Sequence, residues 1–194
     1  MIEIRSGDAL LVVDLQNDFL PGGALAVPHG DAVIAPLNAC VAQFRARGLP
    51  VLASRDWHPP DHRSFTPQGG PWPVHCVAGT PGAAFAAAFA LPPDAPPVSK
   101  ATTPSVEAYS AFAGTDLAER LAAARVRRLF IGGLATDYCV LNTVLDARRL
   151  GYDAVVIEDA IRAVDVQPGD GARALAAMLA AGATLASSAE VAGH

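Results

Sequence analysis

Short apolar runs rich in β-branched residues alternate along this chain with longer segments rich in alanine and leucine. The short runs are typical of buried strands, and the longer segments are typical of helices. The pattern predicts strands at 9–15, 50–56, 127–133, 153–159 and 183–188, and helices at 31–48, 116–125, 137–151 and 169–182. In the helix at 31–48, Asp31 is the expected N-cap and Gly48 the expected end.

Strands that are apolar on both faces and alternate with helices indicate a parallel sheet covered by helices on both sides. A further short extended run ends at Lys100. We therefore predict an α/β fold, a three-layer α/β/α domain with a mainly parallel six-stranded sheet and helices on both faces. The 194 residues are a usual length for one domain with one core, and no linker interrupts them, so we expect 1–194 to form a single domain.

The composition narrows the class of protein. With 52% hydrophobic and 17% charged residues, the chain is expected to be compact rather than disordered. We see no secretory signal and no apolar stretch of the roughly 18 to 20 residues that a membrane span needs. A net charge of −5 with only short basic clusters disfavours nucleic acid as a partner. Three widely spaced cysteines disfavour a disulfide framework, which predicts a cytoplasmic location.

Between residues 56 and 112 the regular pattern is lost, and proline, glycine, histidine and aromatic residues collect there. Long irregular loops in a compact domain are usually functional. In open α/β sheets, ligands bind beyond the carboxyl ends of the strands. The chemistry is therefore expected where "VVD", "SRDWH" and "GGLATDYC" leave their strands.

A group of histidines follows the strand at 50–56. Asp56 and His58 are two residues apart, so in an extended chain both project to the same side, and His62 and His75 follow in the loop. A single histidine is more often an ordinary surface or core residue. Because a carboxylate and several imidazoles gather here, the cluster favours a divalent-metal site.

Cys139 stands where an apolar strand breaks at two glycines and a helix begins. Asp137 is the expected cap of that helix. A cysteine in the first turn of a helix meets unpaired backbone N–H groups and the positive end of the helix dipole, which favour thiolate and can bind an oxyanion. Cys40 lies within a predicted helix and is expected in the core. For Cys76, both a packing role and a redox-sensitive thiol remain open.

Two further charged residues are ambiguous on sequence alone. Asp14 ends the first strand, where it is either an exposed terminus or a buried carboxylate that is paired or used. A lone lysine such as Lys100 usually reaches solvent. Lys100 matters to the chemistry only if it lies near Asp14 and Cys139.

Together, these residues resemble the nicotinamidases (pyrazinamidases) of the isochorismatase-like cysteine hydrolase superfamily. The resemblance covers nearly the whole chain and rests on five motifs in order: "ALLVVDLQNDFLPGGALAV", "SRDWHPPDHRSF", "GPWPVHCVAGTPGAAF", "SKATTPSVEAYSAF" and "GGLATDYCVLNTVLDARRLGYD". The "WPVHC" and "YSAF" segments separate nicotinamidases from more distant members. The segment "KATTPSV" departs from the commoner "KG" after the lysine and leaves the catalytic positions intact.

The resemblance implies a role for each matching position. Asp14, Lys100 and Cys139 match the catalytic triad, and the backbone N–H groups of Ala135 and Cys139 match the oxyanion hole. Asp56, His58 and His75 match the metal ligands, and His62 or Ser64 matches an additional ligand found in some members. Phe19, Leu25, Trp72 and Tyr109 match the substrate pocket, and the Leu134–Ala135 bond matches a position that is cis in the family.

The implied reaction is hydrolysis of nicotinamide to nicotinate and ammonia through a thioester on Cys139, as in NAD salvage, with pyrazinamide as a second substrate. Asp14 would accept the thiol proton, and Lys100 would favour the thiolate. One divalent metal ion is expected, Zn²⁺ before Fe²⁺ or Mn²⁺, as an anchor for the pyridine nitrogen. A homo-oligomer is compatible with the sequence.

Two alternatives remain. A related cysteine amidohydrolase could act on another small amide or carbamoyl compound, although carbamoyl amidases do not need the histidine-rich loop and true isochorismatases lack the cysteine nucleophile. A non-catalytic metal-binding or thiol-sensing protein would use Cys76 and Cys139 differently. The presence of Asp14 and Lys100 disfavours that second reading.

Overall fold

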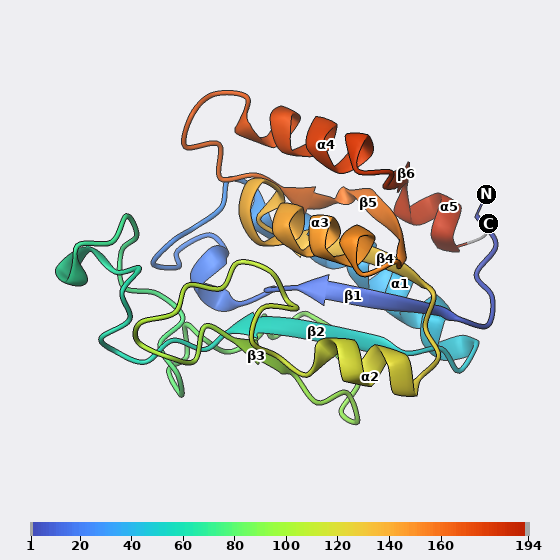
Figure 1. The fold of residues 1–194 in the computed structure, drawn as a ribbon, viewed down its shortest axis with the longest axis horizontal. Helices are drawn as coiled ribbons and strands as arrows, with labels where there is room; N and C mark the ends of the chain where they lie inside the picture. The colour runs from blue at the N-terminus through green and yellow to red at the C-terminus, as the bar shows by residue number, and fades with distance from the viewer. Residues whose placement is uncertain (1, 193–194) are drawn as a thin grey trace.

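The computed structural model of the protein describes residues 2–192, which fold around one parallel sheet (Figure 1). Its six strands within these residues are β1 (Asp8–Val13), β2 (Val51–Asp56), β3 (Val98–Lys100), β4 (Arg128–Leu134), β5 (Asp153–Arg162) and β6 (Thr184–Ala186). They lie in the order β3-β2-β1-β4-β5-β6, and each neighbouring pair is parallel. The first and fourth strands are therefore central.

Helices cover both faces of the sheet, which confirms the predicted α/β/α layers. The helices are α1 (Ile34–Ala46), α2 (Leu117–Ala123), α3 (Leu141–Arg149), α4 (Asp170–Ala180) and α5 (Ser188–Ala192). Residues of α1 and α5 pack into the core on one face, and residues of α2, α3 and α4 into the core on the other. Figure 1 shows α2, α3 and α4 in front of the sheet and α1 behind it. No helix within residues 2–192 is long and apolar enough to cross a bilayer.

Strand β1 shows why the apolar runs are continuous. Leu10 and Val12 pack on the face covered by α1, whereas Leu11 and Val13 pack on the face covered by α3. Successive side chains of a strand point to opposite faces, so a strand buried on both faces needs apolar residues throughout. All six residues of β1 are buried.

The ends of several elements differ from the prediction. The segment expected to begin a helix at Asp31 forms a 3-10 turn, η2 (Gly30–Val33), and α1 begins only at Ile34. Asp31 does not cap α1, because Val33 precedes the helix and makes no side-chain cap bond. The strand expected at 183–188 ends at Ala186, and α5, which the pattern did not predict, begins at Ser188.

Most of the irregular region between β2 and β3 lies at the carboxyl ends of the strands, and its last part, around Pro92 and Asp94, lies beside Val51 at the start of β2. It contains one short 3-10 turn, η3 (Thr66–Gln68), and is otherwise built of turns and loops. In Figure 1 these green loops and the turn η1 (Asn17–Phe19) gather beyond the tips of β1 and β2. The loops therefore lie where an open α/β sheet binds its ligands.

Gly133 allows the end of β4 to approach β1 closely. Its φ is +125°, and a Cβ built there would lie 2.0 Å from the carbonyl oxygen of Val13. Only glycine tolerates both the conformation and the contact. This approach places the turn that follows β4 next to the end of β1.

Gly133→Ala should therefore reduce the free energy of unfolding by more than about 3 kcal/mol, since the strained conformation and the steric overlap add together. Urea unfolding of the variant measures this loss. Gly48→Ala is the matched control, because Gly48 also has a positive φ (+66°) but nothing within 4 Å of the added Cβ, and it should cost only about 1–2 kcal/mol. Equal losses in the two variants would contradict the role given to the Val13 contact.

Candidate active site

The ammonium group of Lys100 lies at the centre of the site. Its Nζ atom is 2.9 Å from Asp14 Oδ2, 2.6 Å from Asp56 Oδ1 and 3.4 Å from Cys139 Sγ. Asp14 directly follows β1, Asp56 ends β2 and Lys100 ends β3, so the parallel sheet delivers all three to one edge. The structure thus resolves both ambiguities of the sequence: Asp14 is buried and paired, and Lys100 lies beside Asp14 and Cys139.

Further hydrogen bonds fix this group in place. Ser54 Oγ donates to Asp14 Oδ1 at 2.7 Å, and Lys100 Nζ donates to the carbonyl oxygen of Ala108 at 3.1 Å. Asp14 is 0% exposed and Lys100 is 1% exposed. Ser54 was not expected in the site, because a serine inside a strand carries no signal of its partner forty residues away.

Burial and neighbouring charges shift the pKa values of Asp14 and Asp56 in opposite directions. Burial raises the pKa of Asp14, and the attraction of Lys100 offsets this only in part. Burial acts in the same direction on Asp56, but Lys100 and then His58 outweigh it, so the pKa of Asp56 falls below its usual value. Burial would lower the pKa of Lys100, yet Asp14 and Asp56 raise it well above 10.5. Lys100 is therefore a cation, and Asp14 is the carboxylate that takes up a proton more readily.

The Cys139 thiol does not behave as the sequence led us to expect. Burial raises its pKa well above 9.0, and the attraction of Lys100 does not compensate for burial and for the negative charges of Asp14 and Asp56. The expectation of a stabilised thiolate was therefore wrong for this environment. Cys139 also lies in a π-helical turn, η4 (Thr136–Val140), rather than in the first turn of α3.

Asp137 does not cap a helix either. Its carboxylate accepts the backbone N–H groups of Val164 at 2.9 Å and Asp165 at 2.8 Å, and it makes no cap bond in η4. Asp137 thus connects the turn that contains Cys139 to the loop after β5. That loop contributes Val164 to the wall of the pocket.

A second group of side chains has the composition of a metal site. The candidate ligand atoms of Asp56, His58 and His75 all lie within 4.8 Å of one another, and all three residues are buried. Neither ring nitrogen of His58 has a hydrogen-bond partner among the described residues, and its Nε2 lies 3.5 Å from Asp56 Oδ2. Buried polar atoms without partners are costly unless they bind something. One carboxylate and two imidazoles are a suitable donor set for a divalent transition metal.

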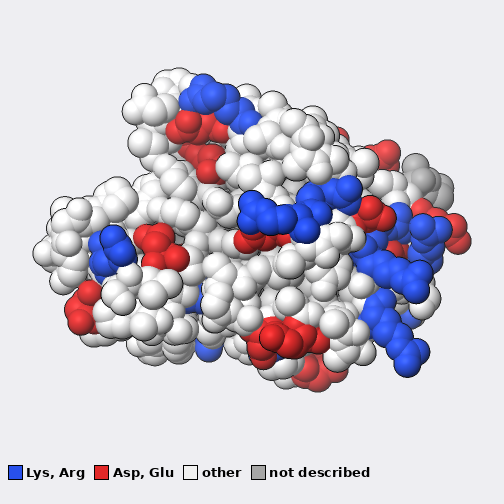
Figure 2. All heavy atoms as spheres, viewed as in Figure 1, with Lys and Arg blue, Asp and Glu red and all other residues white. Residues whose placement is uncertain are grey.

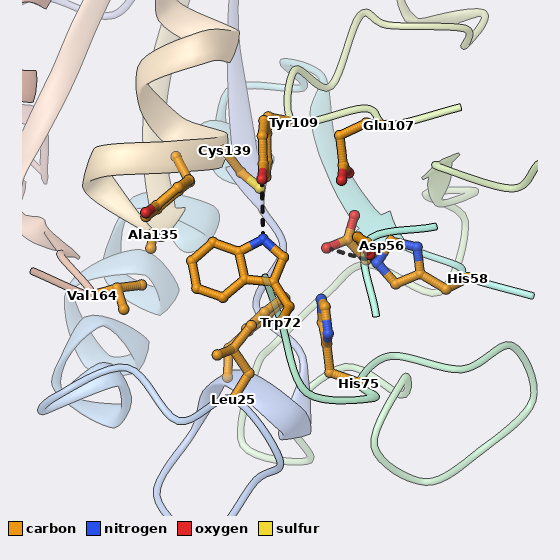
Figure 3. Close-up of a pocket in the computed structure, with 13 residues that line it drawn as sticks. Leu25, Asp56, His58, Trp72, His75, Glu107, Tyr109, Ala135, Cys139 and Val164 are labelled. Carbon is orange, nitrogen blue, oxygen red and sulfur yellow. Dashed lines mark hydrogen bonds and ion pairs between the residues drawn. The ribbon is translucent and has the colours of Figure 1, made fainter. Parts of the chain in front are cut away.

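His75 is oriented for the same purpose. Its Nδ1 donates to the carbonyl oxygen of Pro73 at 2.8 Å, which leaves the lone pair on Nε2. Burial lowers the pKa of His75, so the neutral imidazole is favoured. Figure 3 shows the His75 ring directed toward Asp56 and His58.

His62 packs against the candidate metal ligands. Its ring lies tilted against that of His58, with centroids 4.3 Å apart and an angle of 34° between the planes. Its Nδ1 is 2.7 Å from Ser64 Oγ, and its Nε2 donates to the carbonyl oxygen of Val106 at 3.0 Å. Both ring nitrogens of His62 therefore have partners within the protein, and the residue lies beside the candidate metal site. The additional ligand role that the resemblance allows for His62 or Ser64 stays a prediction.

The predicted substrate-binding residues come together around one pocket (Figure 3). The residues that line it are Phe19, Leu25, Asp56, His58, Ser64, Trp72, His75, Glu107, Tyr109, Ala135, Tyr138, Cys139 and Val164. Trp72 Nε1 donates to the Tyr109 hydroxyl at 3.0 Å. The Leu134–Ala135 peptide bond is cis, as the resemblance implies. The lining is mainly apolar, and it includes both the candidate metal ligands and the Cys139 thiol.

Three lining residues were not predicted from the sequence. Tyr138 packs edge-on against Trp72 with ring centroids 4.9 Å apart, and its position beside Cys139 could have indicated it. Glu107 and Val164 lie in loops, and neither loop carries a sequence signal for its position.

Comparison with known proteins agrees with this geometry. Residues 8–190 match the family model described as the isochorismatase domain. The chain belongs to the isochorismatase family. It is 43% identical to the nicotinamidase of Escherichia coli (strain K12) over 198 residues, which covers 91% of this chain and 93% of the relative. The family resemblance seen in the sequence is confirmed.

Two solved structures of this family are especially similar. Pyrococcus horikoshii pyrazinamidase, solved in complex with zinc, has a TM-score of 0.89 at 48% identity and covers 93% of this chain and 99% of its own. PnC1 from L. infantum, solved in complex with nicotinate, has a TM-score of 0.89 at 36% identity, with 97% and 96% of the two chains covered.

Lys100→Met should reduce the free energy of unfolding by about 3–5 kcal/mol at pH 7, because Asp14 and Asp56 are left buried without their cation. The loss should shrink near pH 4, because the two buried carboxyl groups of the variant, no longer paired with a cation, take up protons and become neutral as the pH falls. In the wild type, Asp56 has a depressed folded pKa, so its contribution to stability is still present at pH 4 and is lost only as the pH falls further below the unfolded value of about 3.9. Urea unfolding at the two pH values measures both effects.

Arg149→Met removes the arginine of an exposed ion pair with Asp146 and serves as the control. It should cost less than about 1 kcal/mol. A Lys100→Met loss of the same size at pH 4 and pH 7 would show that the lysine contributes by packing and not by charge.

Proposed function

We propose that this protein hydrolyses nicotinamide to nicotinate and ammonia through a thioester on Cys139. The observation that carries the proposal is the buried Lys100, which holds Asp14, Asp56 and the Cys139 thiol together at the floor of an aromatic pocket. The similar proteins named nicotinamidase and pyrazinamidase support the same substrate class.

In the first half of the reaction, Asp14 accepts the proton of the Cys139 thiol. The candidate donor and acceptor atoms of Asp14, Asp56 and Cys139 lie within 4.8 Å of one another, so the proton moves over a short path. The sulfur attacks the carboxamide carbon, and the C–N bond breaks as Asp14 returns the proton to the leaving ammonia. The backbone N–H groups of Ala135 and Cys139 are the proposed donors to the oxyanion.

In the second half, Asp14 accepts a proton from water as the water oxygen attacks the thioester carbon. The C–S bond then breaks, and the sulfur regains its proton from Asp14. Lys100 remains charged throughout, since its pKa lies well above 10.5. Its charge offsets the negative charge that moves between Asp14 and Cys139.

Asp56, His58 and His75 are the proposed ligands of one divalent ion, with zinc as the first choice and iron or manganese as alternatives. When bound, this ion would supply a Lewis-acid contact for the pyridine nitrogen. The chain's own residues orient the ring: Trp72, Phe19 and Leu25 line the slot between the cluster and the thiol. Orientation of this kind lowers the barrier by several kcal/mol or more.

Pyrazinamide, which shares the ring nitrogen and the carboxamide, is the proposed second substrate. A related small amide on the same triad is the second candidate function, favoured by the mainly apolar lining of the pocket, which suits other small uncharged amides. A polynucleotide partner stays disfavoured by the net charge of −5. Figure 2 shows basic and acidic groups close together on the drawn face. Three arginines form ion pairs with acidic residues: Arg148 with Asp153, Arg149 with Asp146 and Arg173 with Asp170.

Cys139→Ala should lower kcat for ammonia release from nicotinamide by about 10⁴-fold or more, because no nucleophile remains to form the thioester. Cys40→Ala is the matched control, since Cys40 is buried in the core away from the pocket and its loss should leave kcat unchanged. Mass spectrometry of the wild type quenched during turnover should detect the acyl adduct on Cys139. Full activity of Cys139→Ala would contradict the proposal.

Removal of metal should abolish nicotinamide hydrolysis, and added Zn²⁺ should restore it, because the ring then regains its anchor. Ammonia release before chelation, after chelation and after zinc addition measures this. Added zinc should also raise Tm, since it binds the folded cluster and not the unfolded chain. Activity that persists after complete metal removal would eliminate the anchoring role and leave the triad as proposed.

A further inference from the structure

The carboxylate of Asp18 links two loops that carry opposite parts of the pocket. Asp18 lies in η1, is half-buried and does not line the pocket itself. Its Oδ2 accepts the backbone N–H of Cys76 at 2.7 Å, and its Oδ1 accepts that of Ala24 at 3.2 Å. Cys76 directly follows the candidate metal ligand His75, and Ala24 directly precedes the pocket residue Leu25.

The backbone of Asp18 strengthens the same connection. Its carbonyl oxygen accepts the N–H of Leu25 at 2.9 Å, and its own N–H donates to the carbonyl oxygen of Gly82 at 3.0 Å. One residue thus joins the loop of Leu25, the loop of His75 and the segment around Gly82. His75 and Leu25 both face the pocket in Figure 3.

The backbone conformation of Cys76 depends on its hydrogen bond to Asp18. Its φ is +47°, in the left-handed region that residues other than glycine rarely occupy, and its side chain is fully buried. Such a conformation persists only when its surroundings hold it. The charge-assisted hydrogen bond from Cys76 N–H to Asp18 Oδ2 is such a restraint. Its loss would remove a contact that holds Cys76 in the left-handed conformation.

Gly82 makes room for the carboxylate. A Cβ built on Gly82 would lie 2.2 Å from Asp18 Oδ2 and 2.4 Å from Cγ, so the aspartate can occupy its place only because residue 82 has no side chain. Gly82 is not among the residues with positive φ, so its backbone conformation is one that alanine can adopt. A methyl group at this position would therefore act mainly by displacing Asp18.

We propose that Asp18 is a positioning residue. It fixes the position of His75 relative to Leu25, so that the metal site and the wall of the substrate pocket keep a constant separation. The inference rests on the proposed function, in which His75 binds the metal ion. Asp18 acts through the backbone of its neighbours, because its carboxylate binds the N–H groups of Cys76 and Ala24 and it does not line the pocket.

A double-mutant cycle tests this inference. Asp18→Ala and Gly82→Ala should each weaken Zn²⁺ binding by about 10-fold or more, the range typical of residues that support metal ligands. The double variant should bind zinc no more weakly than Asp18→Ala, because the added methyl group then has no carboxylate to displace. Competition with a chromophoric chelator at equilibrium measures the zinc affinity without using activity.

Steady-state kinetics and a conservative variant distinguish a positioning role of Asp18 from a general loss of stability. Both single variants should raise KM for nicotinamide more than they lower kcat, since the triad itself is untouched. Asp18→Asn keeps one acceptor oxygen and should lie between wild type and Asp18→Ala in zinc affinity. Asp94→Ala, which removes an exposed carboxylate outside the site, should match the wild type.

Two outcomes would overturn the inference. Equal effects of Gly82→Ala in the wild-type and Asp18→Ala backgrounds would show that the methyl group does not act through Asp18. A lower Tm with unchanged zinc affinity and KM would reduce Asp18 to a purely structural role. Failure of the wild type to release ammonia would contradict the proposed function instead, and the zinc cycle would still decide the role of Asp18.

Discussion

Lys100 carries its positive charge where water does not reach, and two carboxylates make that arrangement stable. A lone buried ammonium group would lose its proton, whereas contacts of 2.9 Å and 2.6 Å to Asp14 and Asp56 raise its pKa well above 10.5. The three groups come from the ends of three neighbouring parallel strands. The ion pairs therefore depend on the register of the sheet. The position of Cys139 beside Lys100 depends on that register and on the ion pairs that hold Lys100 in place.

The loops around this centre are held mainly by side chains that bind backbone groups. Gln16 is completely buried, and its amide donates to the carbonyl oxygens of Asp56 and Ala83 while accepting the N–H of Asp56 at 2.8 Å. Asp137 performs a similar task for the loop after β5. Irregular segments lack the hydrogen bonds of strands and helices, so their buried backbone groups need such partners. A long loop region can thus hold the candidate metal ligands in fixed positions without regular structure.

The sequence predicts the sheet, its helical layers and the candidate site more fully than it predicts the links between loops. Continuous apolar runs determine the strands, and residues at the strand ends, such as Asp14 and Asp56, follow from topology. The roles of Asp137 and His62 could not be predicted, because each depends on a backbone group 27 or 44 residues away. The neighbouring sequence predicted that Asp137 caps a helix, but the π-helical turn has no side-chain cap bond. Val164 enters the pocket only through that distant contact.

The protonation state of Cys139 follows from the charge balance of the centre. The Lys100 cation is already paired with the carboxylates of Asp14 and Asp56. A Cys139 thiolate would add a third buried negative charge, and the pKa of the thiol is therefore raised. The proton can leave the sulfur at low cost only by moving to Asp14, whose proton affinity burial also raises. The net charge then stays constant while the nucleophile forms. A thiol that is neutral and 6% exposed at rest reacts slowly with oxidants, which attack thiolate. The same charge balance makes Cys139 a poor redox sensor, and this argues against the thiol-sensing alternative on physical grounds.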